Sequence, residues 1–214
     1  MEITWLGHSC FRLRARGAAL VTDPCDKSTG YSIGRPAADI VTISHDHPAH
    51  SNVSSVAGSP RVVQGPGEFE IASVPITGIA TFHDDQGGKE RGKNVCYVFE
   101  MEGVRICHLG DLGHVPTAEN AEALSGVDIL LVPVGGGSTI GASAAADTVG
   151  LLAPKLVIPM HYKTPAAKAK LDSLDQFLKE LGASDAAKDS QAKLSVSKST
   201  LPQETKVLVL DHRG

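Results

Sequence analysis

Short apolar runs separated by turn residues dominate the first half of the chain. Their alternation of apolar and polar positions is typical of strands: in FRLRA, Phe11 and Leu13 share one face, while Arg12 and Arg14 share the other. Glycine, proline, aspartate or asparagine residues bound each run. We predict strands in EITWL (2–6), FRLRA (11–15), AALVTD (18–23), DIVTIS (39–44), PRVVQ (60–64) and NVCYVFEM (94–101).

Strands alternate with helical patterns in the second half. A helix over 116–126 is indicated by Thr117 at its N-cap and Gly126 beyond its end. A second helix covers 143–154, and the segment 164–182 has leucines at helical spacing before Gly182. Between and after these helices we predict strands at 104–111, 127–134, 155–160 and 206–211. This order predicts one α/β domain over 1–214 with layered sheets, since no linker or repeat interrupts it.

Composition limits the classes of partner. The 214 residues include 20 basic and 24 acidic ones, giving a net charge of −4, and only 4% are aromatic. A nucleic-acid surface is therefore not expected, and a small-molecule substrate is. The start has no signal-peptide pattern and no window approaches ~18 apolar residues, so we expect a cytoplasmic protein without membrane contact. The four cysteines form no C-x-x-C pair and are predicted to be reduced core thiols.

The stretch VTISHDHPAHSN carries the strongest chemical signal. His45, His47 and His50 fall within six residues after a buried-type strand. His45 and His47, two positions apart on an extended chain, would project to the same side and reach one ion. Pro48 ends the strand, and a turn is needed to bring His50 round. Such clustering favours a metal site over isolated structural histidines.

Further candidate ligands stand where other predicted strands end. These are His83 and Asp84 after ITGIATF, Asp111 in HLGDLGH, and His161 in IPMHYKT. Sheet proteins collect their functional residues at such ends. Nitrogen donors with one carboxylate suit zinc best, with manganese or iron as the alternative.

Seven motifs, in this order, carry a family resemblance: TWLGHSCFRL, SHDHPAH, GPGEFEI, FHDD, ICHLGDLGH, LLVPVGGG and VIPMHY. The chain resembles the metallo-β-lactamase-fold hydrolases, and among them the small single-domain group that includes L-ascorbate-6-phosphate lactonase. The resemblance implies a four-layered αββα sandwich with a metal site at one edge, between the sheets. It also implies hydrolysis by a metal-bound hydroxide, because a bound metal lowers the pKa of water toward ~7.

The resemblance further implies two metal sites. Three imidazoles match the first site's ligands (His45, His47 and His83), two match the second site's (His50 and His161), and Asp111 matches the bridging carboxylate. The superfamily motif H-x-H-x-D-H has alanine at its aspartate position here, Ala49. We therefore expect one tight zinc site and a second, weaker one. Asp46 is a poor substitute, because on an extended segment it points away from its neighbours.

Supporting residues are less sharply defined by the sequence. His8 and His114 are alternative proton donors, and Lys163 is a candidate for binding an anionic substrate group. Glu68 and Glu70 either hydrogen-bond a ligating histidine from behind or are surface positions of a strand. His108 is predicted to pack in the core, and His212 to be solvated.

The leading interpretation is a metal-dependent hydrolase of a small, anionic lactone or phosphoester. One alternative is a metal-binding sensor or scaffold without catalysis, which the alanine at position 49 keeps open. A nuclease is a weaker alternative, because net charge −4 and 214 residues do not favour an added nucleic-acid clamp. The sequence specifies neither the substrate nor the oligomeric state, and a homo-oligomer is compatible with it.

Overall fold

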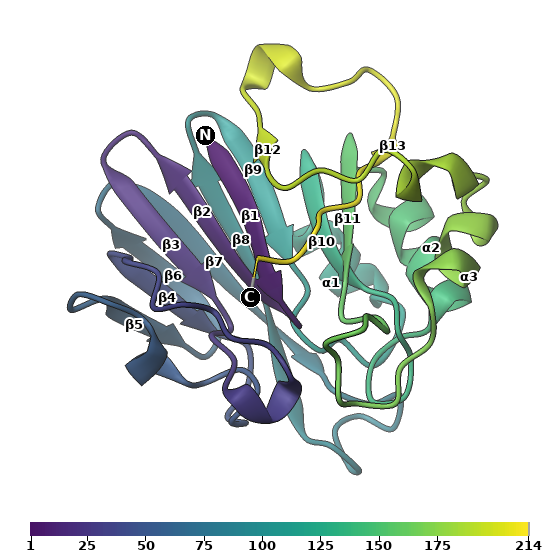
Figure 1. The fold of residues 1–214 in the computed structure, drawn as a ribbon, viewed down its shortest axis with the longest axis horizontal. Helices are drawn as coiled ribbons and strands as arrows, with labels where there is room; N and C mark the ends of the chain where they lie inside the picture. Colours follow the sequence, from purple (N-terminus) through teal and green to yellow (C-terminus); the bar gives the residue numbers. More distant parts are fainter. Residues whose placement is uncertain (214) are drawn as a thin grey trace.

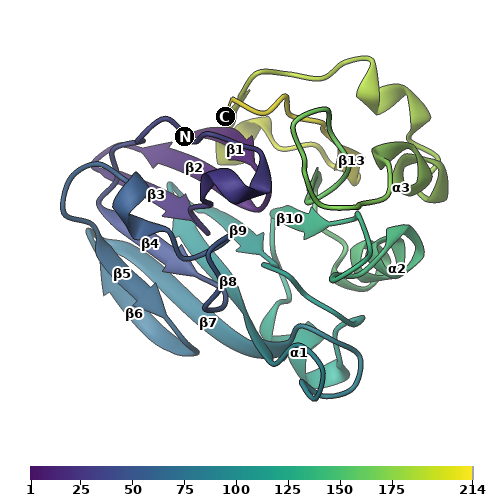
Figure 2. The ribbon, with the colours of Figure 1, turned by 60° about the horizontal axis from the view of Figure 1, so that its bottom comes forward.

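The computed structural model describes residues 1–213 and contains two β-sheets stacked face to face (Figures 1 and 2). The first sheet has the order β12-β1-β2-β3-β4-β5. Its strands β1 to β3 pair antiparallel, and β3 to β5 pair parallel. The strands are β1 (Glu2–Gly7), β2 (Cys10–Ala15), β3 (Ala18–Thr22), β4 (Ile40–Ile43), β5 (Arg61–Gln64) and β12 (Leu194–Ser195).

The second sheet has the order β13-β11-β10-β9-β8-β7-β6. The strands that come first along the chain, β6 to β9, form an antiparallel meander. The strands β9, β10, β11 and β13 pair parallel. The strands are β6 (Gly67–Ile71), β7 (Val74–Phe82), β8 (Lys93–Met101), β9 (Val104–His108), β10 (Ile129–Pro133), β11 (Leu156–Met160) and β13 (Lys206–Val207). The strand expected over 206–211 is thus shorter than its apolar pattern suggests.

The α-helices of the described chain all follow β9. They are α1 (Ala118–Ala123), α2 (Ala142–Leu152) and α3 (Leu174–Glu180), with short 3-10 helices at Lys27–Thr29, Val53–Ser55, Ser184–Ala187 and Lys198–Thr200. Thr117 caps α1 as predicted, because its Oγ1 accepts a hydrogen bond from the Asn120 N–H at 3.2 Å. Helix α2 packs against β10, and α3 packs against α2 (Figure 1). The predicted α/β class with stacked sheets is confirmed.

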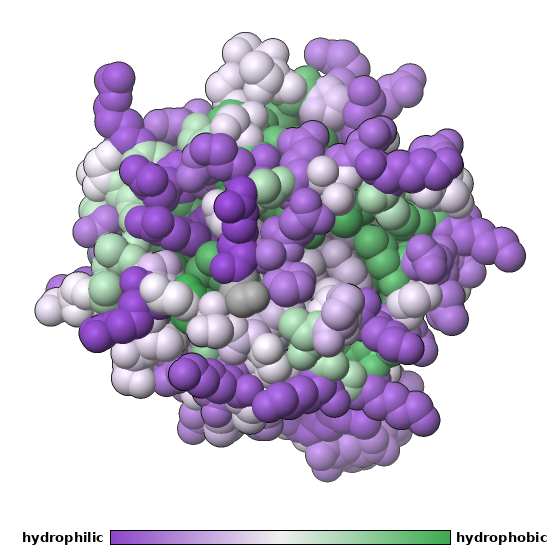
Figure 3. Space-filling view, in the orientation of Figure 1, coloured by the Kyte–Doolittle hydropathy of each residue, from purple (hydrophilic) through white to green (hydrophobic). Residues whose placement is uncertain are grey.

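Side chains on the facing sides of the two sheets form the main core. Phe11 and Leu13 are fully buried, whereas Arg12 and Arg14 on the opposite side of β2 are not, as the alternation predicts. Tyr97 of β8 joins the sheets, since its hydroxyl donates to the carbonyl of Ile43 in β4 at 3.1 Å. Hydrophilic side chains cover much of the outer face seen in Figure 3. The four cysteines are buried and free of disulfides, in line with their prediction as core thiols.

The helix predicted over 164–182 is wrong in its first half. Helix α3 begins only at Leu174, and the preceding segment bonds to other parts of the chain. The N–H of Lys168 donates to the Thr29 carbonyl at 3.0 Å, and that of Asp172 donates to the Gly135 carbonyl at 2.8 Å. These tertiary hydrogen bonds replace helical ones, so the segment lies across the loops beside the metal-binding candidates instead of coiling. No α-helix of the described residues is long and apolar enough to cross a membrane.

Candidate metal centre

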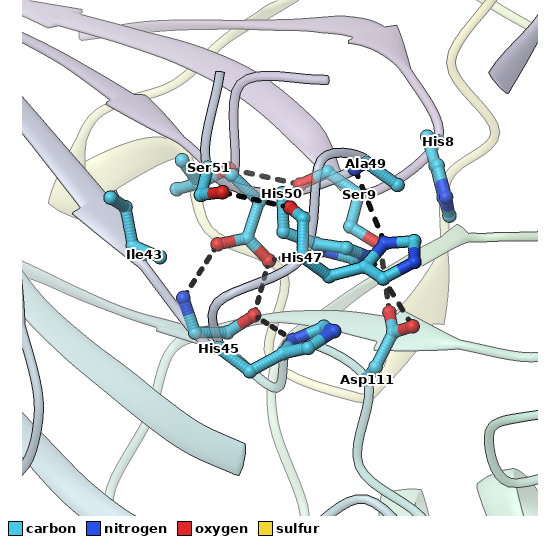
Figure 4. Close-up of polar contacts among 12 residues, drawn as sticks. His8, Ser9, Ile43, His45, His47, Ala49, His50, Ser51 and Asp111 are labelled. Atoms are coloured by element: carbon cyan, nitrogen blue, oxygen red, sulfur yellow. Dashed lines mark hydrogen bonds and ion pairs between the residues drawn. The ribbon is translucent and has the colours of Figure 1, made fainter. Parts of the chain in front are cut away.

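Strand ends from both sheets meet at one edge of the sandwich. His8 follows β1, Asp23 follows β3 and His45 lies two residues beyond β4. From the second sheet, β7 is followed by His83 and β11 by His161. Figure 4 shows His45, His47 and His50 beside Asp111, which follows β9. The candidate residues scattered through the sequence are therefore gathered where the sheets end, as their positions predicted.

The motif segment 45–50 is a turn, not the extended chain expected from the sequence. The His47 N–H donates to the His45 carbonyl at 3.1 Å, and the His50 N–H donates to the His47 carbonyl at 2.8 Å. This turn leaves the rings of His45 and His47 with centroids 6.0 Å apart, and those of His45 and His50 4.2 Å apart. All three imidazoles still face one region. Asp46 is exposed and meets the Ser51 hydroxyl at 3.4 Å, so it does not replace the missing aspartate.

The carboxylate of Asp111 is the centre of the cluster. Its Oδ2 lies 3.3 Å from Nε2 of His50, 3.4 Å from Nε2 of His83 and 3.5 Å from Nε2 of His161. Burial opposes ionisation, but His161 and His50 lower the pKa of Asp111 well below its ordinary value. Gly110 allows this approach, because a Cβ there would lie 2.5 Å from the Ser44 side chain. An ionised carboxylate with three imidazoles around one oxygen is a donor set typical of a metal site.

Three overlapping groups of donor atoms have the spacing that a metal ion requires. In each group the ligand atoms lie within 4.8 Å of one another. The groups are His45 with His47 and His50, His45 with His83 and Asp111, and His8 with His50 and His161. Together they contain all six ligands that the family resemblance implies. The added member is His8, which the sequence suggested only as a proton donor.

Asp23 is a functional candidate that the sequence pattern did not single out. Its Oδ2 lies 2.8 Å from Nδ1 of His50, and it also accepts hydrogen bonds from the Ser44 amide and hydroxyl at 2.8 and 2.6 Å. Burial lowers the pKa of His50, but Asp111 and Asp23 on its two sides outweigh burial and raise it to about 10. Asp23 therefore fixes the ring so that Nε2 faces Asp111. Its position at the end of a predicted strand was the available signal.

The residues present fit a bound transition-metal ion. The Nδ1 atoms of His83 and His161 are buried and have no hydrogen-bond partner within residues 1–213. Burial, together with the neighbouring His50, lowers the pKa of His45 to about 4, so this ring is neutral near pH 7. Neutral imidazoles around one ionised carboxylate are the donors that zinc, iron and manganese sites use.

His114 lies outside the cluster. Its Nδ1 lies 2.8 Å from the Val115 carbonyl, and its Nε2 accepts from the Phe82 N–H at 3.4 Å. With both nitrogens engaged by backbone, the geometry does not favour it as a proton donor. Glu68 and Glu70 are exposed on the edge strand β6, so the interpretation as surface positions fits them better. The carboxylate that supports a histidine of the cluster is that of Asp23.

Asp84, a candidate ligand, and His108, a predicted core residue, both make contacts that stabilise the fold. Asp84 is buried and accepts four backbone hydrogen bonds, from Gln86, Gly88, Glu90 and Arg91. It organises the loop after β7 and is not among the clustered donors. His108 is buried in the core, as predicted, with Nε2 2.8 Å from the Ser9 carbonyl.

The C-terminal histidine corrects the sequence-based expectation. His212 is partly buried, with its ring centroid 5.9 Å from Trp5 and 5.0 Å from Tyr31. The prediction that it is solvated is therefore wrong, because the chain returns to β1 after β13.

One small hollow adjoins the cluster, and a larger one lies beyond Tyr31. The smaller, with a volume of about 20 Å³, is lined mainly by apolar groups next to His8 and His161, including Tyr31, Tyr162 and Leu171. The larger, of about 240 Å³, shares Tyr31 and is lined also by Lys27 and Arg35. Lys163 is exposed and lines neither of these two hollows.

Comparison with known proteins agrees with this geometry. A family model described as the beta-lactamase superfamily domain matches residues 2–161. The chain is 29% identical over 192 residues to a UPF0173 metal-dependent hydrolase of Thermococcus onnurineus, covering 77% of this chain and 85% of that protein. It is 30% identical over 182 residues to a UPF0173 protein of Pyrococcus furiosus, covering 77% and 84%.

A solved structure is similar over almost the entire chain. It is a candidate Zn-dependent hydrolase of the metallo-β-lactamase superfamily from Thermotoga maritima, with 41% identity, a TM-score of 0.81 and 99% coverage of both chains. Both sheets and all the strand ends that carry the candidate ligands fall within this match. The chain therefore belongs to the β-lactamase superfamily and is a metal-dependent hydrolase of the metallo-β-lactamase type.

Proposed function

We propose that the chain uses zinc to hydrolyse a small anionic lactone or phosphoester. The observation that carries this proposal is the convergence of three buried histidine nitrogens, from His50, His83 and His161, on one oxygen of Asp111. Bound by these residues, zinc would supply a water of lowered pKa, toward ~7, and a Lewis acid for a carbonyl or phosphoryl oxygen. The name of the Thermotoga maritima relative and the nitrogen-rich donor set both support zinc.

The protein's own groups have distinct parts in this proposal. Asp111 is ionised and buried, so it orients a polar group at the centre of the cluster without changing protonation near pH 7. The apolar hollow beside His161 has a volume of about 20 Å³, room for about one water molecule, so the substrate body must lie outside it. Lys27 and Arg35, in the hollow beyond Tyr31, offer two cations to an anionic substituent. They replace Lys163 as the preferred anion-binding candidates.

An assay panel tests the proposal. Zinc-loaded and metal-depleted protein would be compared on lactones and phosphomonoesters, each with a matched neutral analogue. We expect turnover that depends on metal and is higher for the anionic member of each pair. The double variant Lys27→Gln/Arg35→Gln should raise KM for the anionic member only. Metal binding without turnover of any substrate would favour the sensor or scaffold alternative, and preference for neutral substrates would contradict the anionic assignment.

Metal analysis of the purified protein tests the metal itself. Zinc retained after dialysis is expected. Iron or manganese in its place would refute the choice of zinc but leave metal-dependent hydrolysis intact.

A further inference from the structure

His8 lies at the place where the family motif lacks a ligand. The resemblance assigns His50 and His161 to the second metal site, together with an aspartate that is Ala49 here. The ring centroid of His8 lies 4.9 Å from that of His50 and 4.3 Å from that of His161. One donor atom from each of the three rings lies within 4.8 Å of the others. We infer that His8 ligates a second metal ion together with His50 and His161, in place of the missing aspartate.

The backbone holds His8 in this position. Its φ of 52° is left-handed, a conformation that is unfavourable for a non-glycine residue. The carbonyl of His8 accepts hydrogen bonds from Trp5 Nε1 at 2.9 Å and from the N–H of His161 at 3.3 Å. The preceding Gly7 has a φ of 107°, and a Cβ there would lie 2.3 Å from the Tyr31 ring. The turn after β1 is thus fixed to His161 itself, and it directs one imidazole toward the other.

The imidazole of His8 has no other role visible in its surroundings. Within residues 1–213 neither of its nitrogens has a hydrogen-bond partner, although the ring is partly buried against two other imidazoles. Its nitrogens are therefore not engaged by the described chain and are free to bind a metal ion shared with His50 and His161. In Figure 4, His45 lies to the left of Asp111, and His8 lies above it and to the right.

A histidine ligand in place of the missing aspartate restores the number of donor atoms at the second site but not the negative charge. With His8, the second ion has three imidazoles and a share of Asp111, which is a complete four-donor set for zinc. An imidazole is neutral, however, so two dications ~3.5–4 Å apart remain less shielded than with an aspartate. The second ion is therefore bound specifically, yet more weakly than the first. A ligating nitrogen is not free to donate a proton, so this role excludes His8 as the acid.

The inference rests on the proposed metal-dependent function and is tested by metal content. His8→Asn removes the imidazole, and asparagine tolerates left-handed backbone better than alanine does. Zinc binding would be followed by competition with a chromophoric chelator, and Co²⁺ binding by its absorption spectrum. We expect about two ions in the wild type, about one in His8→Asn, and about two again in His8→Asn/Ala49→Asp, since the aspartate returns the lost donor. His114→Ala, a histidine outside the cluster, serves as the control and should retain both.

Each outcome has a distinct meaning. Equal second-site affinity in the wild type and in His8→Asn would overturn the role of His8 but leave the metal-dependent function intact. A wild type that binds only one ion would overturn it as well. A wild type that binds no metal would overturn the proposed function too. If His8→Asn does not fold, anomalous diffraction from zinc-loaded wild-type crystals decides, because a ligating nitrogen of His8 must lie ~2.0–2.1 Å from the second ion.

Discussion

Oδ2 of Asp23 lies 2.8 Å from Nδ1 of His50, and Nε2 of the same ring faces Asp111 at 3.3 Å. The imidazole is therefore held between two buried carboxylates, one from each sheet. The outer carboxylate, Asp23, is itself fixed by the amide and hydroxyl of Ser44. Such a carboxylate–histidine pair orients the ring and raises its basicity as a ligand.

Asp23→Asn should weaken metal binding by about 10–100-fold, because the amide removes the charge that fixes the His50 ring. Asp39→Asn is a matched control, since Asp39 also accepts a backbone hydrogen bond, from Ala19 at 2.8 Å, but lies away from the cluster. Chelator competition on both variants measures the effect. Equal affinities in the two variants would show that Asp23 does not position the ligand.

His47→Ala should remove the tight ion and reduce activity by more than about 100-fold. Losing a ligand weakens metal binding more than losing a residue that hydrogen-bonds a ligand, which costs about 10–100-fold. His47 is exposed, so the substitution should leave folding intact. Elemental analysis after dialysis and a thermal melt check both statements. His114→Ala provides the comparison, and full metal content in His47→Ala would remove His47 from the ligand set.

Metal binding at pH 7 should release about one proton from His50, since a ligating Nε2 must be unprotonated. In the metal-free protein the pKa of His50 is raised to about 10, whereas that of His45 is lowered to about 4. Apparent affinity should therefore fall about tenfold for each unit of pH lowered from about 10 to 7, where His50 is the group that takes up the proton. Calorimetry in two buffers of different ionisation enthalpy counts the proton. A buffer-independent enthalpy would contradict it.

Asp84→Asn should destabilise the loop after β7 in a pH-dependent way. Burial raises the pKa of Asp84, but hydrogen bonds from the backbone of Arg91, Gly88 and other loop residues outweigh burial and lower it to about 2. The folded-state value lies below the ordinary one, so the ionised carboxylate stabilises the protein above about pH 4. That stabilisation disappears as the pH falls through about 2.

Denaturation midpoints from pH 7 down to pH 3, with amide exchange in the loop, measure this effect. The difference between wild type and Asp84→Asn should be largest at pH 7 and shrink with acid. Asp85→Asn is the control. The Asp85 carboxylate is next in sequence to Asp84, but it is exposed and accepts one side-chain hydrogen bond, from Gln86. A difference that stays constant with pH would rule out the carboxylate charge as its cause.

The sequence by itself determined the features that depend on neighbouring residues. Alternation in FRLRA fixes which side of β2 faces the core, because side chains along a strand point alternately to opposite faces. Thr117 specifies the start of α1, because its side chain accepts a hydrogen bond from the backbone N–H three residues later. The candidate ligands could be recognised as histidines and aspartates at strand ends, and six of the seven lie in the cluster, Asp84 being the exception.

Tertiary structure decided what depends on segments far apart in the chain. Leucine spacing predicted a helix from 164, but backbone hydrogen bonds to Thr29 and Gly135 keep the chain before α3 irregular instead of helical. No local pattern distinguishes Asp23 from other strand-end carboxylates, or marks His8 as a ligand instead of a proton donor. Their roles arise because sheet packing brings β1, β3 and β11 to the same edge, where each residue meets a partner more than 25 positions away. Only the packed sheets supply those contacts, since periodicity records which face of a strand is buried but not what lies against it.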